Sequence, residues 1–201
     1  MSTEEYDAVH DKHLIEVFES REELLQGKFL RVLRDVVKLP NGHLTTREFV
    51  THPGAVMIVP IMDDGRLVME RQYRYPVQQV FLEFPAGKLD AGESVFDCAK
   101  RELLEETGYS ATEWARAGLL HPTISYSTEF IDIWFARGLR AGARQLDDGE
   151  FLDVVLVSPA ELLQGCFDGT VTDAKTLTAT LWLQNMQSGA WALDWRTVRV
   201  G

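Results

Sequence analysis

Three glutamates and an arginine crowd into one turn of a helix near the middle of this chain. Residues 94–107 predict that helix, because a serine stands at its start and a glycine directly after its end. Side chains three and four positions apart share a helix face, so Glu102, Glu105 and Glu106 converge on one patch. Two carboxylates about 4 Å apart repel by roughly 4 kcal/mol at an effective dielectric near 20, so the patch needs a compensating cation.

Two interpretations of the patch are open from the glutamates alone. One is a solvated acidic face, which is what a run of charge usually forms. The other is a metal site, for which oxygen ligands select a hard cation such as Mg²⁺ or Mn²⁺, and Mg²⁺ in particular bridges substrate phosphates.

The remaining hydrophobic pattern predicts a layered α/β (α+β) domain around a mixed sheet. Residues 29–50 predict a β-hairpin with a two-residue turn at Asn41-Gly42, and residues 55–75 predict a second hairpin. The first 25 or so residues show little periodicity. Later strands and helices are expected at residues 130–136, 151–157, 158–165 and 173–189.

Composition excludes several classes of protein. The 201 residues favour one domain with an extension, and a net charge of −11 argues against a broad nucleic-acid surface. No apolar run approaches the length of a membrane span, and the acidic, polar start of the sequence predicts a cytoplasmic protein. The two cysteines, Cys98 and Cys166, are too few and too far apart for a zinc motif.

The residues around the glutamates favour the metal site. Gly87, five residues, Glu93, seven residues, then the run from Arg101 to Tyr109 (RELLEETGY) match the signature of the Nudix hydrolases at every fixed position. A chance match anywhere in the chain has a probability on the order of 10⁻⁷ at ordinary residue frequencies. The chain therefore resembles a Nudix hydrolase.

This resemblance implies metal-dependent cleavage of a nucleoside diphosphate linked to another group. In the family the helix glutamates bind divalent metal, so the implied ligands are Glu102, Glu105 and Glu106 with the backbone carbonyl of Ala86. Mg²⁺ is the expected cofactor, with Mn²⁺ as a substitute. Glu105 also counts as a catalytic residue, and Arg101 is expected to hold a neighbouring carboxylate in place. Gly87 is expected to permit a close approach of the backbone.

Outside the signature the chain resembles the ADP-ribose pyrophosphatase branch of the family, from about Arg47 to the helix after Asp173. The matching stretches are REFVTHPGAV, ERQYRYPV, LEFPAGKLD and HPTISYSTEFIDIWFA. The resemblance implies four residues that bind substrate: Arg74, Glu83, Pro122 and Glu129. For each of them an ordinary structural role, such as an ion pair or a cap, is the alternative.

The general base is expected on an acidic loop, because the signature glutamates are committed to metal. In this branch a mobile loop before a late strand supplies it, and here Asp147, Asp148 and Glu150 flank Gly149. Glu150 is the first candidate and Asp148 the second. A polar turn without a catalytic role is the alternative.

The same resemblance implies the domain organisation. Residues 1–50 are expected to form a small antiparallel sheet extension that makes a homodimer, and residues 51–201 a catalytic Nudix-type α/β/α sandwich.

ADP-ribose is the expected substrate, giving AMP and ribose 5-phosphate. The rivals are another sugar nucleotide such as GDP-mannose, a nucleoside triphosphate, and a binding module that senses a nucleotide without cleaving it. The last rival typically lacks one or more signature glutamates, and this chain has them all.

Overall fold

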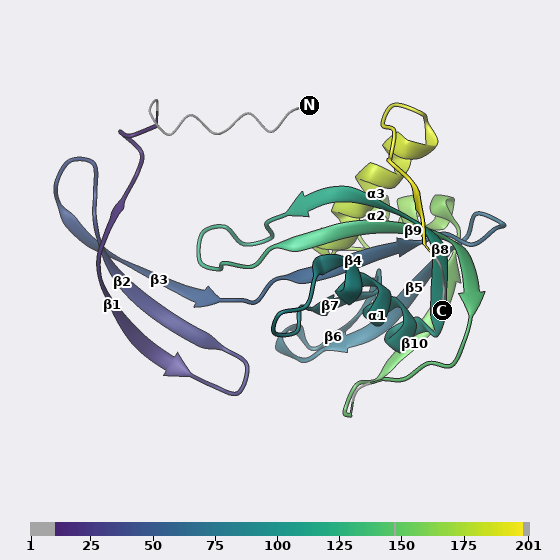
Figure 1. The fold of residues 1–201 in the computed structure, drawn as a ribbon, viewed down its shortest axis with the longest axis horizontal. Coiled ribbons are helices and arrows are strands. Elements are labelled where there is room, and N and C mark those ends of the chain that lie inside the picture. Colours follow the sequence, from purple (N-terminus) through teal and green to yellow (C-terminus); the bar gives the residue numbers. More distant parts are fainter. Residues whose placement is uncertain (1–10, 147, 199–201) are drawn as a thin grey trace. The chain divides into compact units, whose positions relative to one another are not determined.

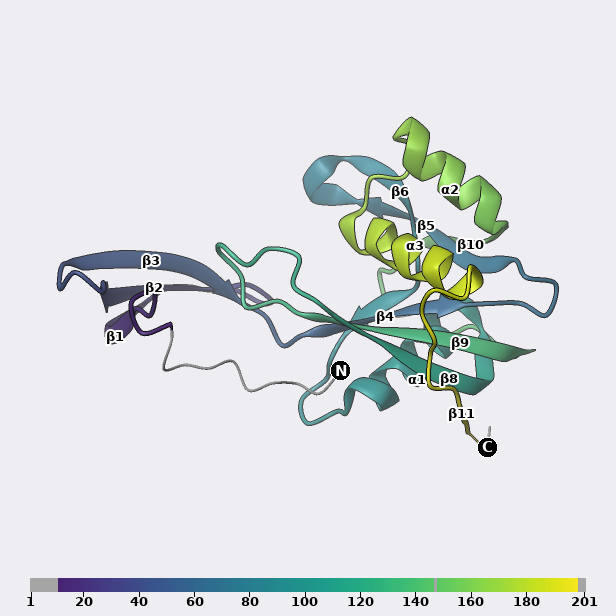
Figure 2. The same cartoon turned by 90° about the horizontal axis from the view of Figure 1, so that it is seen from above.

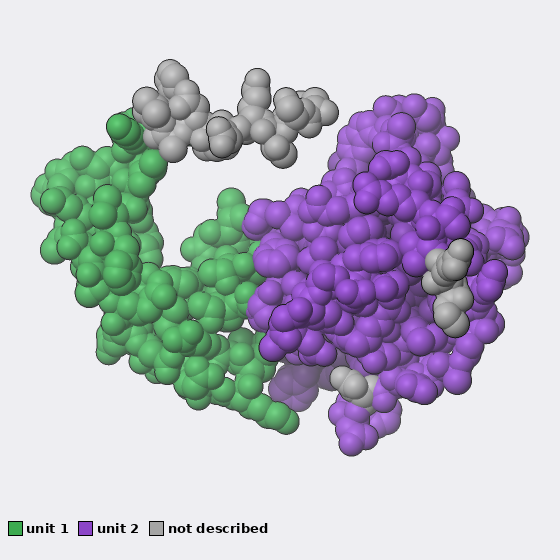
Figure 3. Space-filling view, in the orientation of Figure 1, with its two compact units in different colours: residues 1–52, 123–129 green, residues 53–122, 130–201 purple. Residues whose placement is uncertain are grey.

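A computed structural model describes residues 11–146 and 148–198, so that Asp147 lies outside the described residues. The described residues divide into two compact units, a smaller one within residues 1–52 and 123–129 and a larger one within residues 53–122 and 130–201 (Figure 3). A dimer-forming role for residues 1–50 stays a prediction.

The smaller unit is built on a three-stranded antiparallel sheet. Its order is β1-β2-β3, with bounds β1 Val17–Gln26, β2 Arg31–Lys38 and β3 Leu44–Thr51 (Figure 1). Residues 123–129 join the unit because the amide of Val50 donates to the carbonyl of Tyr126 over 2.9 Å, and the amide of Thr128 donates back to Val50 over 3.0 Å.

The predicted first hairpin is confirmed as β2 and β3, but its turn is one residue longer than expected. The amide of Leu39 donates to the carbonyl of His43, and the amide of Gly42 donates to Leu39, so three residues stand between the paired positions. Gly42 takes a φ of +86°, which a three-residue hairpin loop needs at its last position. Pro40 supplies the fixed φ of an ordinary turn before it.

Strand β1 was not predicted. All ten of its residues are exposed, so its sequence, VFESREELLQ, lacks the alternation that a half-buried strand would show. Charged side chains hold it to its neighbour instead. The guanidinium of Arg21 donates two hydrogen bonds to the carboxylate of Asp35, over 2.7 and 2.8 Å.

The larger unit contains two sheets. The five-stranded sheet has the order β11-β8-β9-β4-β7, in which β4 and β9 run parallel and the other pairs antiparallel. The three-stranded sheet has the order β10-β5-β6 and is antiparallel. The bounds are β4 Ala55–Pro60, β5 Leu67–Arg74, β6 Gln79–Glu83, β7 Ala86–Lys88, β8 Tyr109–Leu120, β9 Ile131–Ala141, β10 Leu152–Val157 and β11 Arg196–Thr197.

The predicted second hairpin is confirmed at its turn but wrong in the pairing of its strands. The amide of Met62 donates to the carbonyl of Arg66 over 2.8 Å and Ile61 bridges Leu67, but strands β4 and β5 then belong to different sheets. All six residues of β4 are buried, because it lies inside the larger sheet with β9 on one side and β7 on the other. A turn signal between two apolar runs does not distinguish a hairpin from a chain that crosses between sheets.

The three helices were predicted correctly. Helix α1 spans Val95–Thr107, α2 Pro159–Asp168 and α3 Ala174–Gln187. Each begins at a side-chain cap, from Ser94, Ser158 and Asp173 respectively. No helix among the described residues is long and apolar enough to cross a membrane.

The layers of the larger unit pack on opposite faces of β4. Met57 and Val59 face a core shared with α2, α3 and the three-stranded sheet, whereas Val56 and Ile58 face a core shared with α1. Figure 2 shows the same order, with α1 on one side of β4, β8 and β9 and with α2 and α3 on the other. The predicted layered α+β fold around a mixed sheet is therefore confirmed.

Candidate active site

Helix α1 carries the signature glutamates into the larger unit. The hydroxyl of Ser94 accepts a hydrogen bond from the amide of Asp97 at the start of the helix, and Gly108 ends it with a φ of +75°. The buried residues Ala99 and Leu103 fix one face of the helix against the sheet. That packing directs the neighbouring face, with its carboxylates, toward the loop before β7 and toward β5.

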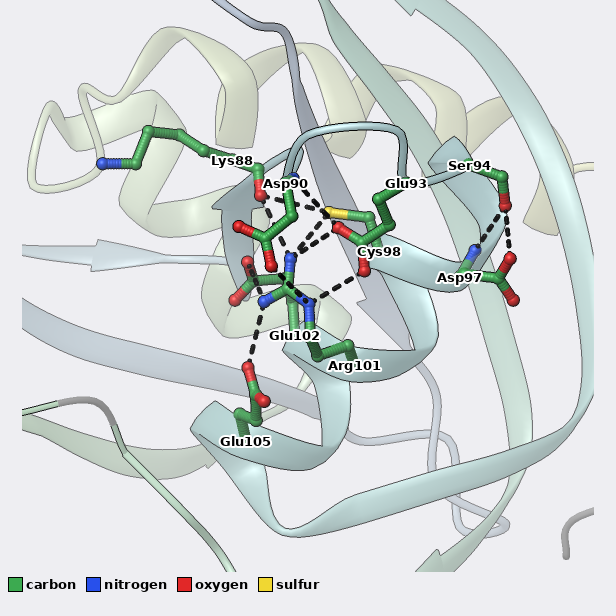
Figure 4. A network of polar contacts seen from close by, with 9 residues as sticks. All are labelled: Lys88, Asp90, Glu93, Ser94, Asp97, Cys98, Arg101, Glu102 and Glu105. Atoms are coloured by element: carbon green, nitrogen blue, oxygen red, sulfur yellow. Dashed lines mark hydrogen bonds and ion pairs between the residues drawn. The ribbon is translucent and has the colours of Figure 1, made fainter. Parts of the chain in front are cut away.

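Arg101 joins the carboxylates of this face, as Figure 4 shows. Its guanidinium donates two hydrogen bonds to Glu93, over 2.9 and 2.8 Å, one to Glu102 over 2.8 Å and one to Glu105 over 3.0 Å. A fifth goes to the backbone carbonyl of Lys88, over 3.1 Å. The arginine lowers the pKa of Glu93 to about 2, so this carboxylate is charged and stays in place at neutral pH. The expectation that Arg101 holds carboxylates in place matches these contacts.

Gly87 allows the carboxylate of Glu102 to lie against the backbone. A Cβ added at position 87 would overlap the carboxyl group of Glu102. The expected close approach at Gly87 is confirmed, because the backbone of β7 at Gly87 and the side chain of Glu102 on α1 occupy adjoining space.

Glu106 is the deepest of the three predicted ligands. It is 3% exposed, and its carboxylate accepts a hydrogen bond of 3.0 Å from the amide of Ala86. Burial, together with the charges of Glu70, Glu102 and Glu150, holds the pKa of Glu106 well above its usual range. Burial also raises the pKa of Glu102, to about 7, although Arg101 opposes the change. The site therefore concentrates carboxyl groups that resist ionisation until a cation is close.

The chemistry of these residues fits a divalent metal ion, although their side chains are not already arranged as a ligand set. No group of three His, Cys, Asp or Glu side chains in residues 11–146 and 148–198 is already arranged to hold an ion. Arg101 engages Glu102 and Glu105, and the amide of Ala86 engages Glu106. The donors are nonetheless all oxygens, with Glu102 and Glu106 buried and Glu105 partly exposed, and oxygen ligands are what Mg²⁺ and Mn²⁺ prefer.

A second polar network joins strands β5 and β6 to the start of α3. The Arg74 guanidinium donates two hydrogen bonds of 2.8 Å to the buried carboxylate of Glu83. Lys175 donates to the same carboxylate and, over 3.0 Å, to Asp173. Burial raises the pKa of Glu83, but the two cations outweigh it and hold the pKa below its usual value. The structure thus brings Arg74 and Glu83 together as an ion pair, which is the structural role left open for Glu83, and their substrate-binding roles stay predictions.

The candidate bases of the acidic loop differ in position. Glu150 is half-buried and accepts a hydrogen bond of 3.2 Å from the side-chain amide of Gln72. Its charge contributes to the raised pKa values of Glu102 and Glu106, which places it within electrostatic reach of the signature glutamates. Asp148 is exposed. The structure brings Glu150 toward the site and gives no such contact for Asp148.

The two remaining predicted site residues, Pro122 and Glu129, form no hydrogen bond or ion pair with these networks among the described residues. Pro122 is half-buried in the loop after β8, and no hydrogen bond or ion pair links it to the glutamates. Glu129 belongs to the smaller unit, where its carboxylate lies 3.8 Å from the ring of His52. Their substrate-binding roles stay predictions.

Sequence reasoning missed three residues of the site: Glu70, Gln72 and Lys175. The first two had a readable signal, because Glu70, Gln72 and Arg74 alternate along β5 and therefore share one face of the strand. Lys175 had none, since it stands 92 positions from Glu83 along the chain.

Comparisons with known proteins agree with this geometry. The model of the NUDIX domain family matches residues 51–179. An ADP-ribose pyrophosphatase of Bacillus subtilis (strain 168) is 35% identical over 175 residues, which is 86% of this chain and 95% of that protein. A methanol dehydrogenase activator of Bacillus methanolicus is 38% identical over 167 residues, 81% of this chain and 89% of that protein. The crystal structure of an ADP compounds hydrolase superposes with a TM-score of 0.80 at 27% identity, covering 88% of this chain and 97% of the other.

Proposed function

The chain belongs to the Nudix family, and on that premise we propose that it cleaves the pyrophosphate bond of ADP-ribose to give AMP and ribose 5-phosphate. The observation that carries the proposal is the burial of Glu102 and Glu106 on one helix face, where Arg101 pairs with Glu102 but, among the described residues, no cation pairs with Glu106. The names of the pyrophosphatase of Bacillus subtilis and of the superposed hydrolase support an ADP compound as the substrate.

Nudix hydrolases use divalent metal, and Mg²⁺ is the ion that we propose here. Glu102, Glu105 and Glu106, with the carbonyl of Ala86, would hold it, and it would neutralise phosphate charge and lower the pKa of a bound water. Arg101 would keep Glu102 and Glu105 oriented through its hydrogen bonds of 2.8 and 3.0 Å.

Arg74 is suited to hold the diphosphate beside this centre. Its bonds to Glu83 use Nε and Nη2 and do not involve Nη1, and its side chain is 43% exposed. A planar guanidinium binds phosphate oxygens in pairs. Glu83 and Lys175 then serve to fix the direction in which Arg74 points.

Glu150 is the residue that we assign as general base. It lies within electrostatic reach of the signature glutamates and is anchored by Gln72. A positioned base typically contributes about 10²- to 10⁴-fold to the rate. Glu150→Gln should therefore lower kcat by at least about 10²-fold with little change in KM, and an unchanged kcat would move the role to Asp148 or to a signature glutamate.

The substrate-binding roles of Pro122 and Glu129 and a cytoplasmic location are also part of the proposal.

A homodimer is the last part of the proposal. Support for the dimer comes from the smaller unit, which exposes several large apolar side chains on its sheet and on the turn between β1 and β2: Val17, Phe18, Leu25, Phe29 and Leu44. Few side chains of its sheet are buried, notably Leu33 and Val37, which is a small core for three strands. A second copy of the chain would cover that surface.

The substrate assignment is tested by a panel of ADP-ribose, GDP-mannose, UDP-glucose, NADH and ATP, each with Mg²⁺ and with products separated by chromatography. We expect the highest kcat/KM for ADP-ribose. A higher value for GDP-mannose or UDP-glucose would replace the substrate but keep the reaction. Tight binding of ADP-ribose without cleavage of any compound would instead make the chain a sensing module.

A further inference from the structure

Glu70 is a buried carboxyl group at the centre of the three-stranded sheet, and no role has been given to it. It lies on β5 opposite Glu83 of β6 and Val154 of β10, and it is 2% exposed. Glutamate is almost never fully buried unless it is paired. The position therefore calls for a partner that can compensate its charge.

Among the described residues, no cation forms an ion pair with Glu70. Glu70 hydrogen-bonds to Glu106, which is also acidic, and the other nearby charges include those of Glu150 and Glu83. Arg74 is the cation that acts on Glu70, but it is committed to Glu83 by two hydrogen bonds of 2.8 Å.

One oxygen of Glu70 is left without any partner. Its Oε1 is fully buried and makes no hydrogen bond to any described residue. An unsatisfied buried oxygen of a carboxyl group costs about 1–3 kcal/mol or more. The same carboxyl group contacts Glu106, which is held by the amide of Ala86, so Glu70 lies beside one of the predicted metal ligands.

We propose that Glu70 is a further ligand of the divalent metal centre, binding the ion through Oε1 together with Glu106. The inference rests on the metal site of the proposed function and adds to it a ligand from the sheet, outside the signature helix. The ion would supply the positive charge that both carboxyl groups lack, and it would satisfy the unpartnered oxygen.

The test is a titration with Mn²⁺ in the absence of substrate. Binding is measured as the loss of the free-ion signal in electron paramagnetic resonance. The variants are Glu70→Gln, which keeps the shape, Glu70→Asp, which keeps the charge but shortens the side chain, and Glu106→Gln. Glu113→Gln is the matched control, because Glu113 lies in the same unit, is paired with Arg137 and is only half-buried, with 36% of its side chain exposed. We expect Glu70→Gln, Glu70→Asp and Glu106→Gln each to raise the Kd by about tenfold or more, and the control to leave it unchanged.

Each outcome separates this inference from the proposed function. If Glu106→Gln weakens binding and Glu70→Gln does not, Glu70 is not a ligand while the metal site stands. If Glu70→Asp binds as the wild type does but Glu70→Gln does not, Glu70 acts by charge alone and the ligand role is overturned. If neither Glu70→Gln nor Glu106→Gln changes the Kd, the metal site of the proposed function fails as well.

A second variant keeps the test decisive if Glu70→Gln folds poorly. Replacing a buried charged group by an apolar one of similar volume is often neutral or stabilising. Glu70→Met should therefore melt at or above the temperature of the metal-free wild type, and Mn²⁺ should raise its melting temperature less than it raises that of the wild type. An equal rise in both proteins would contradict the ligand role.

Discussion

Gly87 shows how a single residue shapes the site, because the carboxylate of Glu102 occupies the space that a side chain would fill. The signature therefore carries two kinds of information. Its glutamates supply charge, and its first glycine supplies room for one of them. Arg101 contributes orientation, since its hydrogen bonds to Glu93, Glu102 and Glu105 set the direction of these side chains.

Gly87→Ala should disable the site without unfolding the protein. The new methyl group would push Glu102 away, and a displacement of about 1 Å at a catalytic group can cost about 10²-fold in rate. We expect kcat to fall by that order, with a melting temperature close to that of the wild type. Gly142→Ala is the control, because a Cβ there would meet no carboxylate: its nearest neighbour would be the backbone carbonyl oxygen of Gly108, at 3.3 Å. Full activity of Gly87→Ala would contradict the role of this contact.

The buried carboxyl groups also predict how stability depends on pH. Burial raises the pKa of Glu70 and of Glu106 above the ordinary glutamate value of 4.5. The folded protein then binds protons more tightly than the unfolded chain, so these groups stabilise the fold most below pH 4.5 and less as the pH rises. We expect the metal-free melting temperature to fall between pH 5 and pH 8.

Saturating Mg²⁺ should reverse the fall of the melting temperature with pH, because a glutamate carboxyl group must lose its proton to bind metal. The rise in melting temperature on adding Mg²⁺ should therefore be larger at pH 8 than at pH 5. A rise of the same size at both values would indicate that the ion binds elsewhere. The measurement is differential scanning fluorimetry with and without a chelator.

At the scale of elements, the sequence predicted those with local signals and missed those that depend on partners. Helix α1 could be predicted because its cap, its apolar face and its final glycine are all within residues 94–108. Strand β1 could not, because its ten residues are exposed and held by charged partners on β2. The separation of β4 from β5 into two sheets depends on β9, which lies about 70 residues further along the chain.

The start of α3 provides a prediction at the same scale. Lys175 is 11% exposed and supports Glu83, which orients Arg74. A hydrogen bond to a charged group contributes about 1.5–3 kcal/mol, so Lys175→Met should raise the KM for ADP-ribose by about tenfold or more, while kcat changes little. Lys100→Met is the control, because Lys100 pairs with Asp97 on the exposed side of α1. An unchanged KM in Lys175→Met would remove this network from substrate binding.

At the scale of the whole molecule, the layered fold followed from the sequence, whereas the partners within the site followed only in part. The signature located Glu102, Glu105 and Glu106 because they are close in sequence, and the resemblance located Arg74 and Glu83. Glu70 was missed although it alternates with Gln72 and Arg74 along β5, whereas Lys175 was missed because only the fold brings it to Glu83.

The homodimer is tested at this scale too. Sedimentation velocity of the full chain at tens of micromolar should give a dimer, because the exposed apolar side chains of the smaller unit, including Phe18 at 56% and Leu44 at 63%, would otherwise face water. Leu44→Glu is an accompanying variant, expected to shift the equilibrium toward monomer. A wild-type monomer at this concentration would contradict the proposal.

The most direct test of the central claim, that the buried glutamates serve metal-dependent pyrophosphate cleavage, is ADP-ribose turnover by the wild type and by Glu106→Gln. The amide of this variant can still accept the hydrogen bond from Ala86. We predict AMP and ribose 5-phosphate from the wild type with Mg²⁺ and none after chelation, and a kcat at least about 10²-fold lower for Glu106→Gln, since metal-ion catalysis contributes several kcal/mol. Turnover that persists after chelation, or that Glu106→Gln retains in full, would contradict the claim.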